Sequence, residues 1–273
     1  MRLCFRTLAI FAFIAFAGIN LAFAQDEPAK IEEKKPEPAA TPAKIDPKNM
    51  TAEQIAEATL FVYGYPGGRE TLQRIRKTSI ERGTVRVANG DGRMENASYQ
   101  KWSIRGESLD KEKIRLDQDF ATARYALIFN DDKVLGLYND AVFTPREDAS
   151  KAFENQIVRG LEALLRYKEN GSTLALAGRD KVMGVEFNQI DVTDKQGRKT
   201  RFFVSVKSFR VMMLEYEEGG VKYKRRFYDY NYAQGTLVPY RTVLWADDKI
   251  VEETNIGTVT FGQKVDEGLF RTS

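Results

Sequence analysis

The sequence contains no histidine, and its single cysteine is Cys4, near the start of the chain. These shortages exclude an internal disulfide, the usual His and Cys ligand sets of zinc sites, and any catalytic dyad or triad built on Cys or His. The sequence also lacks a Gly-x-Ser-x-Gly nucleophile turn and a Gly-rich phosphate loop ahead of a helix. We therefore predict that the protein is not an enzyme and uses no metal or cofactor.

One enzymatic alternative remains, because paired carboxylates can act as the acid and base of a glycosidase. The adjacent acidic pairs Asp131-Asp132 and Asp247-Asp248 are the residues to consider. Both pairs fall at apparent turns, where Asp is favoured because its side chain bonds to the nearby backbone. We interpret them as turn residues.

The first 24 residues have the layout of a secretory signal peptide. Arg2 and Arg6 precede an apolar stretch over residues 8–19, and Ala22-Phe23-Ala24 fits cleavage before Gln25. The apolar stretch is shorter than the roughly 20 residues of a membrane-spanning helix. A retained membrane anchor is the alternative, but we predict a cleaved signal peptide over residues 1–24 and a periplasmic location.

The charge balance argues against a nucleic-acid partner. Removal of residues 1–24 takes away Arg2 and Arg6 and no acidic residue, so the formal net charge falls from +3 to +1. A nearly neutral exported protein has no general attraction to polyanions. We therefore expect no nucleic-acid binding.

Residues 25–48 are rich in Pro, Ala, Lys and Glu, and contain too few large apolar side chains to form a core. We predict a disordered linker, which either tethers the domain at a distance from a membrane or cell wall or is simply solvated. From residue 49 the composition becomes globular. Residues 49–273 contain no second linker and are predicted to form a single domain.

This domain begins with helical signals and continues with strand signals. Thr51 and Gln54 form a capping box for a first helix that should end near Gly64, and a second short helix should pass through Leu72 and Ile75. Pairs of strand-like segments then flank turn sequences such as residues 89–92, 130–133 and 247–249. Successive hairpins of this kind predict a long antiparallel meander.

One amphipathic helix interrupts the meander. Thr144 and Pro145 form its predicted start, and Phe153, Ile157 and Leu161 then recur at helical spacing through Tyr167. Such a helix must bury its apolar stripe, and the concave face of the sheet is the expected place.

The stretch VKYKRRFYDYNY, residues 221–232, mixes basic and aromatic side chains. Strict alternation predicts that one face of a strand carries Lys222, Lys224, Arg226, Tyr228, Tyr230 and Tyr232. Long cationic side chains and phenols suit a solvent-exposed or interfacial face. We interpret the stretch first as a structural strand, with contact to anionic lipid or to a protein partner as the alternative.

The C-terminal segment TLVPYRTVLWADDKIVEETNIGTVTFGQKVDEGLF resembles the last hairpin of bacterial outer-membrane lipoprotein-sorting proteins, the LolA-like group. The matching features are Gly235 followed by Pro239 at the entry, the acidic turn, Asp266, and the pair Leu269-Phe270. The first helix and the break at Gly67-Gly68 also look like the entry of that group. The resemblance covers roughly residues 50–271 and holds as an ordered set of individually weak motifs.

The resemblance implies an α+β, mainly antiparallel β fold: a strongly curved, half-open β-barrel with helices capping its concave face. Members of the group hold acyl chains in the apolar cavity between sheet and helices. Our candidates for lining such a cavity are Phe129, Leu137, Phe153, Ile157, Leu161, Leu164, Phe227 and Trp245. The alternative for each of these residues is an ordinary place in the packed core.

The first functional hypothesis is therefore a periplasmic carrier or binding protein for lipids or lipid-modified proteins, active in lipoprotein sorting, transport and outer-membrane biogenesis. The alternative is an envelope sensor or assembly factor that binds proteins through the face carrying Lys222, Lys224, Arg226, Tyr228, Tyr230 and Tyr232. Peripheral membrane contact is compatible with both, and a monomer is expected.

Overall fold

The computed structural model describes residues 49–139 and 141–271, and the predicted signal peptide and linker lie outside this range. The helices are α1 (Ala52–Tyr63), α2 (Arg69–Ile75), η1 (Leu109–Lys111), α3 (Glu147–Val158), α4 (Leu161–Leu165) and η2 (Glu267–Phe270). The strands are β1 (Thr78–Ala88), β2 (Met94–Ile104), β3 (Lys113–Phe120), β4 (Arg124–Asn130), β5 (Lys133–Tyr138), β6 (Ala141–Phe143), β7 (Thr173–Val182), β8 (Val185–Thr193), β9 (Lys199–Ser205), β10 (Val211–Glu218), β11 (Val221–Ala233), β12 (Thr236–Ala246) and β13 (Lys249–Phe261).

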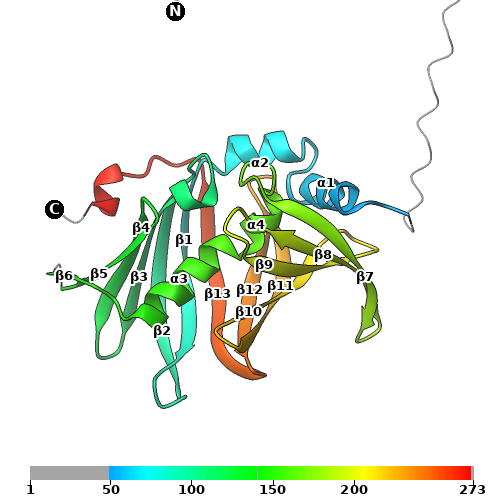
Figure 1. Ribbon diagram of the computed structural model, residues 1–273. Helices are drawn as coiled ribbons and strands as arrows, with labels where there is room; N and C mark the ends of the chain where they lie inside the picture. The colour runs from blue at the N-terminus through cyan, green and yellow to red at the C-terminus, as the bar shows by residue number, and fades with distance from the viewer. Residues whose placement is uncertain (1–48, 140, 272–273) are drawn as a thin grey trace, which may run out of the picture. The chain divides into compact units, whose positions relative to one another are not determined.

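All 13 strands form one antiparallel sheet in the order β6-β5-β4-β3-β2-β1-β13-β12-β11-β10-β9-β8-β7. Neighbours in space are neighbours in sequence except at the centre, where β1 pairs with β13, for example Ile80 with Thr260. The sheet curves around α3 and α4 and leaves β6 and β7 as separate edges (Figure 1). The predicted antiparallel, half-open fold with helices over one face is confirmed.

Local signals account for the first helix. The Thr51 hydroxyl accepts from the Gln54 amide at 3.2 Å, and the Gln54 side chain accepts from the Thr51 amide at 2.8 Å. This reciprocal capping box fixes the start of α1, as predicted. α1 and α2 lie along the upper edge of the sheet in Figure 1.

The predicted single helix through Tyr167 is wrong, because the structure divides it into α3 and α4. Arg159 ends α3 and Gly160 precedes α4 with extended backbone angles. A Cβ atom at Gly160 would lie 2.3 Å from the Gln156 carbonyl oxygen. The chain therefore bends where a side chain could not be accommodated, and α3 begins after Arg146 rather than at Pro145.

We call the face of the sheet that packs against α1, α3 and α4 the inner face. It carries the main core, in which Ile55, Phe153, Leu164 and Phe202 are all buried. A separate cluster on the opposite, outer face joins Ile128 to Val265 and Phe270 of the C-terminal segment. Among residues 49–139 and 141–271, no helix is long and apolar enough to cross a membrane.

Candidate functional site

A cavity of about 310 Å³ lies between the inner face of the sheet and helices α3 and α4. Apolar side chains from the helices and from the sheet reach it, and charged side chains line it as well. The apolar set includes Val85, Leu109, Ile114, Leu116, Phe153, Ile157, Leu161, Phe227, Val238 and Phe261. The cavity is thus positioned where the resemblance places an acyl-chain site, but its lining is more polar than expected.

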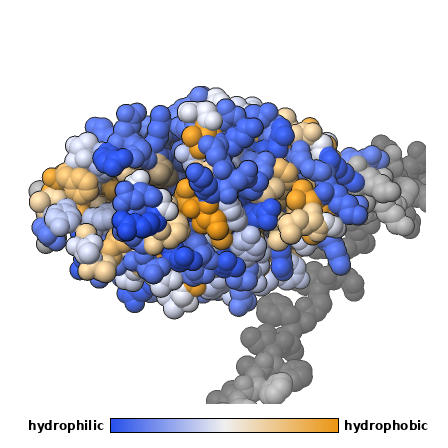
Figure 2. All heavy atoms as spheres, turned by 90° about the horizontal axis from the view of Figure 1, so that it is seen from below, coloured by the Kyte–Doolittle hydropathy of each residue, from blue (hydrophilic) through white to orange (hydrophobic). Residues whose placement is uncertain are grey.

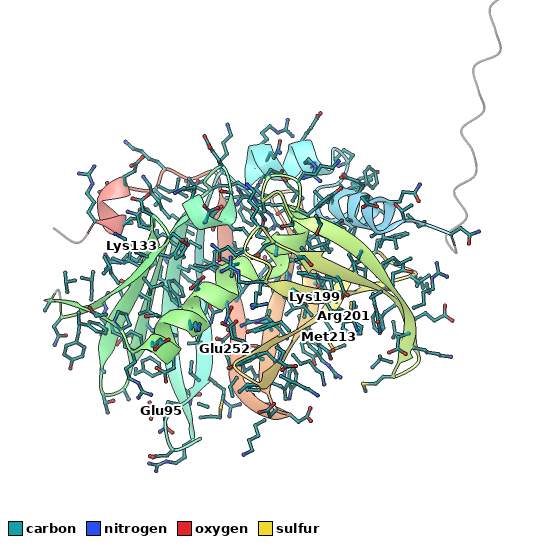
Figure 3. The ribbon with its side chains drawn as sticks, in the orientation of Figure 1. Glu95, Lys133, Lys199, Arg201, Met213 and Glu252 are labelled. Atoms are coloured by element: carbon teal, nitrogen blue, oxygen red, sulfur yellow. The ribbon has the colours of Figure 1, made fainter. Side chains whose placement is uncertain are left out.

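Helix α3 forms one wall because Phe153 and Ile157 stand four residues apart on its apolar face and both reach the cavity. Gln156 of the same helix donates to Glu252 of β13 at 2.6 Å, and Arg225 of β11 pairs with that carboxylate at 2.9 Å. Glu252 lies near the middle of the sheet (Figure 3). These polar bonds hold α3 across the central strands and leave space beneath it.

A second carboxylate on the cavity wall, that of Glu81, is paired with a cation and also accepts a hydrogen bond. Glu81 accepts from the Tyr99 hydroxyl at 2.7 Å and pairs with Lys101 at 3.1 Å. Burial, together with the negative charge of Glu81, raises the pKa of Tyr99 well above its ordinary value. Tyr99 therefore stays neutral and acts as a hydrogen-bond donor.

The end of the cavity nearest α2 and α4 is formed by five charged residues, which we call the arginine cluster: Arg76, Arg105, Glu112, Glu162 and Arg166. Glu162 pairs with Arg76 at 2.7 Å and with Arg105 at 3.1 Å, and Glu112 pairs with Arg166. Burial opposes ionisation of Glu162, but the three guanidinium groups outweigh it and lower its pKa. For Glu112, the effect of burial is larger than that of the nearby Arg166, and it raises the pKa of this carboxyl to about 7.

Four of the eight predicted cavity residues line this cavity, namely Phe153, Ile157, Leu161 and Phe227. Phe129 and Leu164 are fully buried in the main core and are not part of the lining. Leu137 packs on the outer face with the C-terminal cluster. Trp245 also faces outward, because it pairs with Lys224 and lies 5.6 Å from the Arg226 guanidinium. The structure thus brings half of the predicted set together.

The charged residues of the cavity wall were not among the cavity residues predicted from the sequence. Arg76, Arg105 and Arg166 follow α2, β2 and α4, and Glu112 follows η1. No local spacing relates these positions, since only the fold brings them to one end of the cavity. The only local signal is the polar pair Glu162 and Arg166 inside a short apolar segment.

The basic and aromatic strand is β11. Lys222, Lys224, Arg226 and Tyr228 share the outer face as predicted, where Lys224 lies 3.9 Å from Glu215 and Tyr228 lies under the Arg241 guanidinium. Lys222 and Lys224 also border a hollow of about 910 Å³ together with Lys199 and Arg201.

The predicted position of Tyr230 on that same face is wrong. Asp229 adopts a left-handed backbone conformation with φ of 52°, which breaks the alternation of side chains. Tyr230 therefore packs against the main core and bonds to Tyr63 of α1 at 3.0 Å. Tyr232 is half exposed, and its hydroxyl donates to the Val62 carbonyl of α1 at 3.3 Å. A protein-binding role for this strand stays a prediction from the sequence.

The surface of the folded unit that is seen from below shows no continuous apolar patch. Figure 2 shows apolar residues in separate patches among hydrophilic ones. Within the described residues, no group of three or more His, Cys, Asp or Glu side chains is arranged to hold a metal ion.

No protein-family profile and no curated protein matches the sequence. Solved structures do match. A LolA superfamily protein from Nitrosomonas europaea has a TM-score of 0.58 at 13% identity over 82% of this chain and 98% of its own. A putative outer membrane lipoprotein-sorting protein domain from Vibrio parahaemolyticus has a TM-score of 0.56 at 13% identity over 80% of this chain and 97% of its own.

A third similar structure is a DUF1329 family protein from Desulfovibrio piger ATCC 29098, with a TM-score of 0.54 at 12% identity over 82% of this chain and 98% of its own. All three alignments span nearly the whole of the other chain, so the likeness concerns the complete fold and not one motif. The described part of this chain has the fold of the LolA superfamily and of lipoprotein-sorting proteins.

Proposed function

We propose that the protein is an exported, non-enzymatic binding protein that holds acyl chains, of lipids or of lipid-modified proteins, between its sheet and helices α3 and α4. The observation that carries the proposal is the cavity of about 310 Å³ beneath α3. Its size falls at the lower end of the roughly 300–1,000 Å³ usual for small-molecule sites. The shared fold with a putative lipoprotein-sorting domain agrees with this assignment.

Burial of a lipid tail supplies about 0.8 kcal/mol per CH₂ group, so apolar walls alone provide affinity. Phe153, Ile157 and Leu161 offer such walls from the helices, and Phe227 offers one from the sheet. The charged groups beside them are paired with one another, which is the condition for keeping charges next to an apolar ligand. A ligand with both an apolar tail and a polar end fits this lining best.

The test is native mass spectrometry of protein purified from a bacterial periplasm, followed by solvent extraction and lipid analysis. The Leu161→Trp variant fills the cavity, and we expect it to lose a co-purified acyl species that the unmodified protein retains. Leu176→Trp is the matched control, because Leu176 is exposed on β7 and does not line the cavity. Retention of the species by Leu161→Trp, or its loss from both folded variants, would contradict the proposal.

A further inference from the structure

The charges of the cavity wall do not cancel. Two of its ion pairs are balanced, Lys101 with Glu81 and Arg225 with Glu252. The remaining charged wall residues are those of the arginine cluster, which contains three guanidinium groups and two carboxylates. One positive charge is therefore in excess, and it is located at a single end of the cavity.

Burial makes this excess significant. The exposed fraction of the side chain is 3% for Arg166, 11% for Arg76 and 13% for Arg105. An uncompensated charge in such surroundings is unfavourable unless an opposite charge joins it. The Glu162 carboxylate contacts both Arg76, at 2.7 Å, and Arg105, at 3.1 Å, so these two cations lie close together.

The guanidinium groups are also held in fixed directions. Arg76 donates to the Leu237 carbonyl at 2.8 Å, Arg105 to the Leu72 carbonyl at 3.1 Å, and Arg166 to the Gly106 carbonyl at 2.7 Å. These bonds anchor the cluster to α2, β12 and the loop after β2. A rigid set of donors loses little conformational freedom when a ligand binds, and it is the arrangement expected of a preformed site.

Donors in the cluster remain unused. The Nε atoms of Arg76 and Arg166 have no acceptor among the described residues, although both atoms are buried. Buried N–H groups are nearly always paired, so such donors indicate a missing partner. Guanidinium groups bind carboxylate and phosphate oxygens best, since their planar donors match the geometry of these anions.

We propose that the arginine cluster is an anion subsite of the cavity, which holds the carboxylate or phosphate headgroup of an acyl ligand while the tail lies against Phe153, Ile157 and Phe227. The inference rests on the proposed acyl-binding function and adds the chemical class of the ligand, an anionic amphiphile.

The experiment measures competition against a neutral naphthyl dye bound to delipidated full-length protein. The competitors are palmitate, palmitoyl lysophosphatidic acid, the uncharged monopalmitin, and inorganic phosphate alone. We expect the two anionic lipids to compete about tenfold more strongly than monopalmitin, equivalent to ~1.4 kcal/mol. Inorganic phosphate alone should not displace the dye.

Arg105→Gln is the test variant, because Arg105 is the cluster arginine with the largest exposed fraction and retains a polar side chain after the change. It should remove the preference for anionic lipids and leave competition by monopalmitin unchanged. Arg241→Gln is the matched control, since Arg241 pairs with Glu253 and lies over Tyr228 on the outer face. This control should keep the preference.

The outcomes separate the two proposals. If neutral and anionic lipids compete equally in the unmodified protein, or if Arg105→Gln weakens all lipids alike, the anion subsite is wrong while acyl binding stands. If phosphate alone binds as tightly as lysophosphatidic acid, the site takes a free anion and the amphiphile assignment is wrong. If no lipid competes and the dye does not bind, the acyl-binding function itself is wrong.

Discussion

At the scale of single residues, three groups join α1 to the inner face. The Tyr63 hydroxyl donates to Tyr230 at 3.0 Å and accepts from the Val211 amide at 3.3 Å, and Tyr230 in turn donates to the Val211 carbonyl. The ring of Tyr63 is fully buried, and burial raises its pKa to about 12. The two tyrosine hydroxyls and the Val211 backbone thus supply one another's hydrogen-bond partners inside the protein.

Tyr63→Phe should therefore destabilise the fold by about 1–3 kcal/mol, because the Val211 amide loses its acceptor while the apolar ring is kept. The measurement is the free energy of unfolding in urea. Tyr228→Phe on the outer face is the control and should change that energy by less than about 0.5 kcal/mol. Equal effects of the two substitutions would contradict the role of the buried hydroxyl.

Glu57 of α1 makes a second connection, with bonds to Arg69 at 2.9 Å, to the Tyr167 hydroxyl at 2.8 Å and to Lys168 at 2.8 Å. Burial opposes ionisation of this carboxyl, but the bonds from Lys168, Tyr167 and Arg69 outweigh it and lower the pKa to about 2. A depressed pKa stabilises the folded state above the ordinary value of 4.5, and this contribution is lost as the pH falls from 4.5 towards 2.

Glu57→Gln should consequently be less stable than the unmodified protein at pH 7, with a difference that shrinks as the pH falls below 4.5. Because 40% of the side chain is exposed, solvent screening should keep the difference below about 1 kcal/mol. Urea unfolding at a series of pH values tests this. A difference that is constant with pH would show that the ionised carboxylate is not its source.

The backbone angles of single residues also show what the sequence could and could not predict. Asp132 and Asp248 adopt left-handed backbone angles in turns, as the acidic pairs predicted. Asp229 adopts the same conformation inside β11, and nothing in its neighbours distinguishes it from a regular strand residue. One backbone angle therefore turns Tyr230 away from the predicted surface set and against the main core.

At the scale of elements, the break between α3 and α4 decides where the cavity lies. Gly160 and Leu161 both line the cavity, and Glu162 of the arginine cluster follows directly. The apolar periodicity correctly predicted which side of the helices faces the sheet. It could not predict the bend, because that depends on how closely the Gln156 carbonyl oxygen approaches the position that a Cβ atom at residue 160 would occupy.

Gly160→Ala distinguishes the bent arrangement from a continuous helix. Inside a continuous helix, Ala in place of Gly stabilises by up to about 1 kcal/mol. Here the new Cβ would lie 2.3 Å from a backbone oxygen, so the substitution should lower the free energy of unfolding. Gly90→Ala is the control, since no atom lies within 4 Å of its added Cβ. An increase in stability of Gly160→Ala would contradict the observed break.

At the scale of the whole molecule, the sheet depends on its C-terminal strand. Truncation after Asp248 removes β13 and leaves β1 and β12 without the strand that joins them, so we expect no cooperative unfolding transition. Truncation after Gln263 removes only the segment with Val265 and Phe270 from the outer face and should destabilise by roughly 2–5 kcal/mol. Circular dichroism and urea unfolding of the two chains test this. Cooperative folding of the shorter chain would overturn the expectation.

The fold as a whole was more predictable than its site. Hairpin turns and capping signals are local, and their order along the chain was sufficient for an antiparallel meander with helices on one face. The strands β3, β6 and β7 were not predicted, and the cavity wall combines side chains that lie far apart in the sequence. Long-range contacts of this kind have no signature in a single sequence.

The pairing of β1 with β13 also determines when, during folding, the sheet can be completed. Ile80 and Thr260 are 180 positions apart, whereas each hairpin on either side joins close neighbours. The flanking hairpins can form as soon as their residues are available, but the central pair must wait for the end of the chain. We expect closure of this pair to be the slow step of folding, because non-local contacts form slowly. A nascent chain that lacks β13 therefore cannot complete the sheet, however many of its hairpins have already formed.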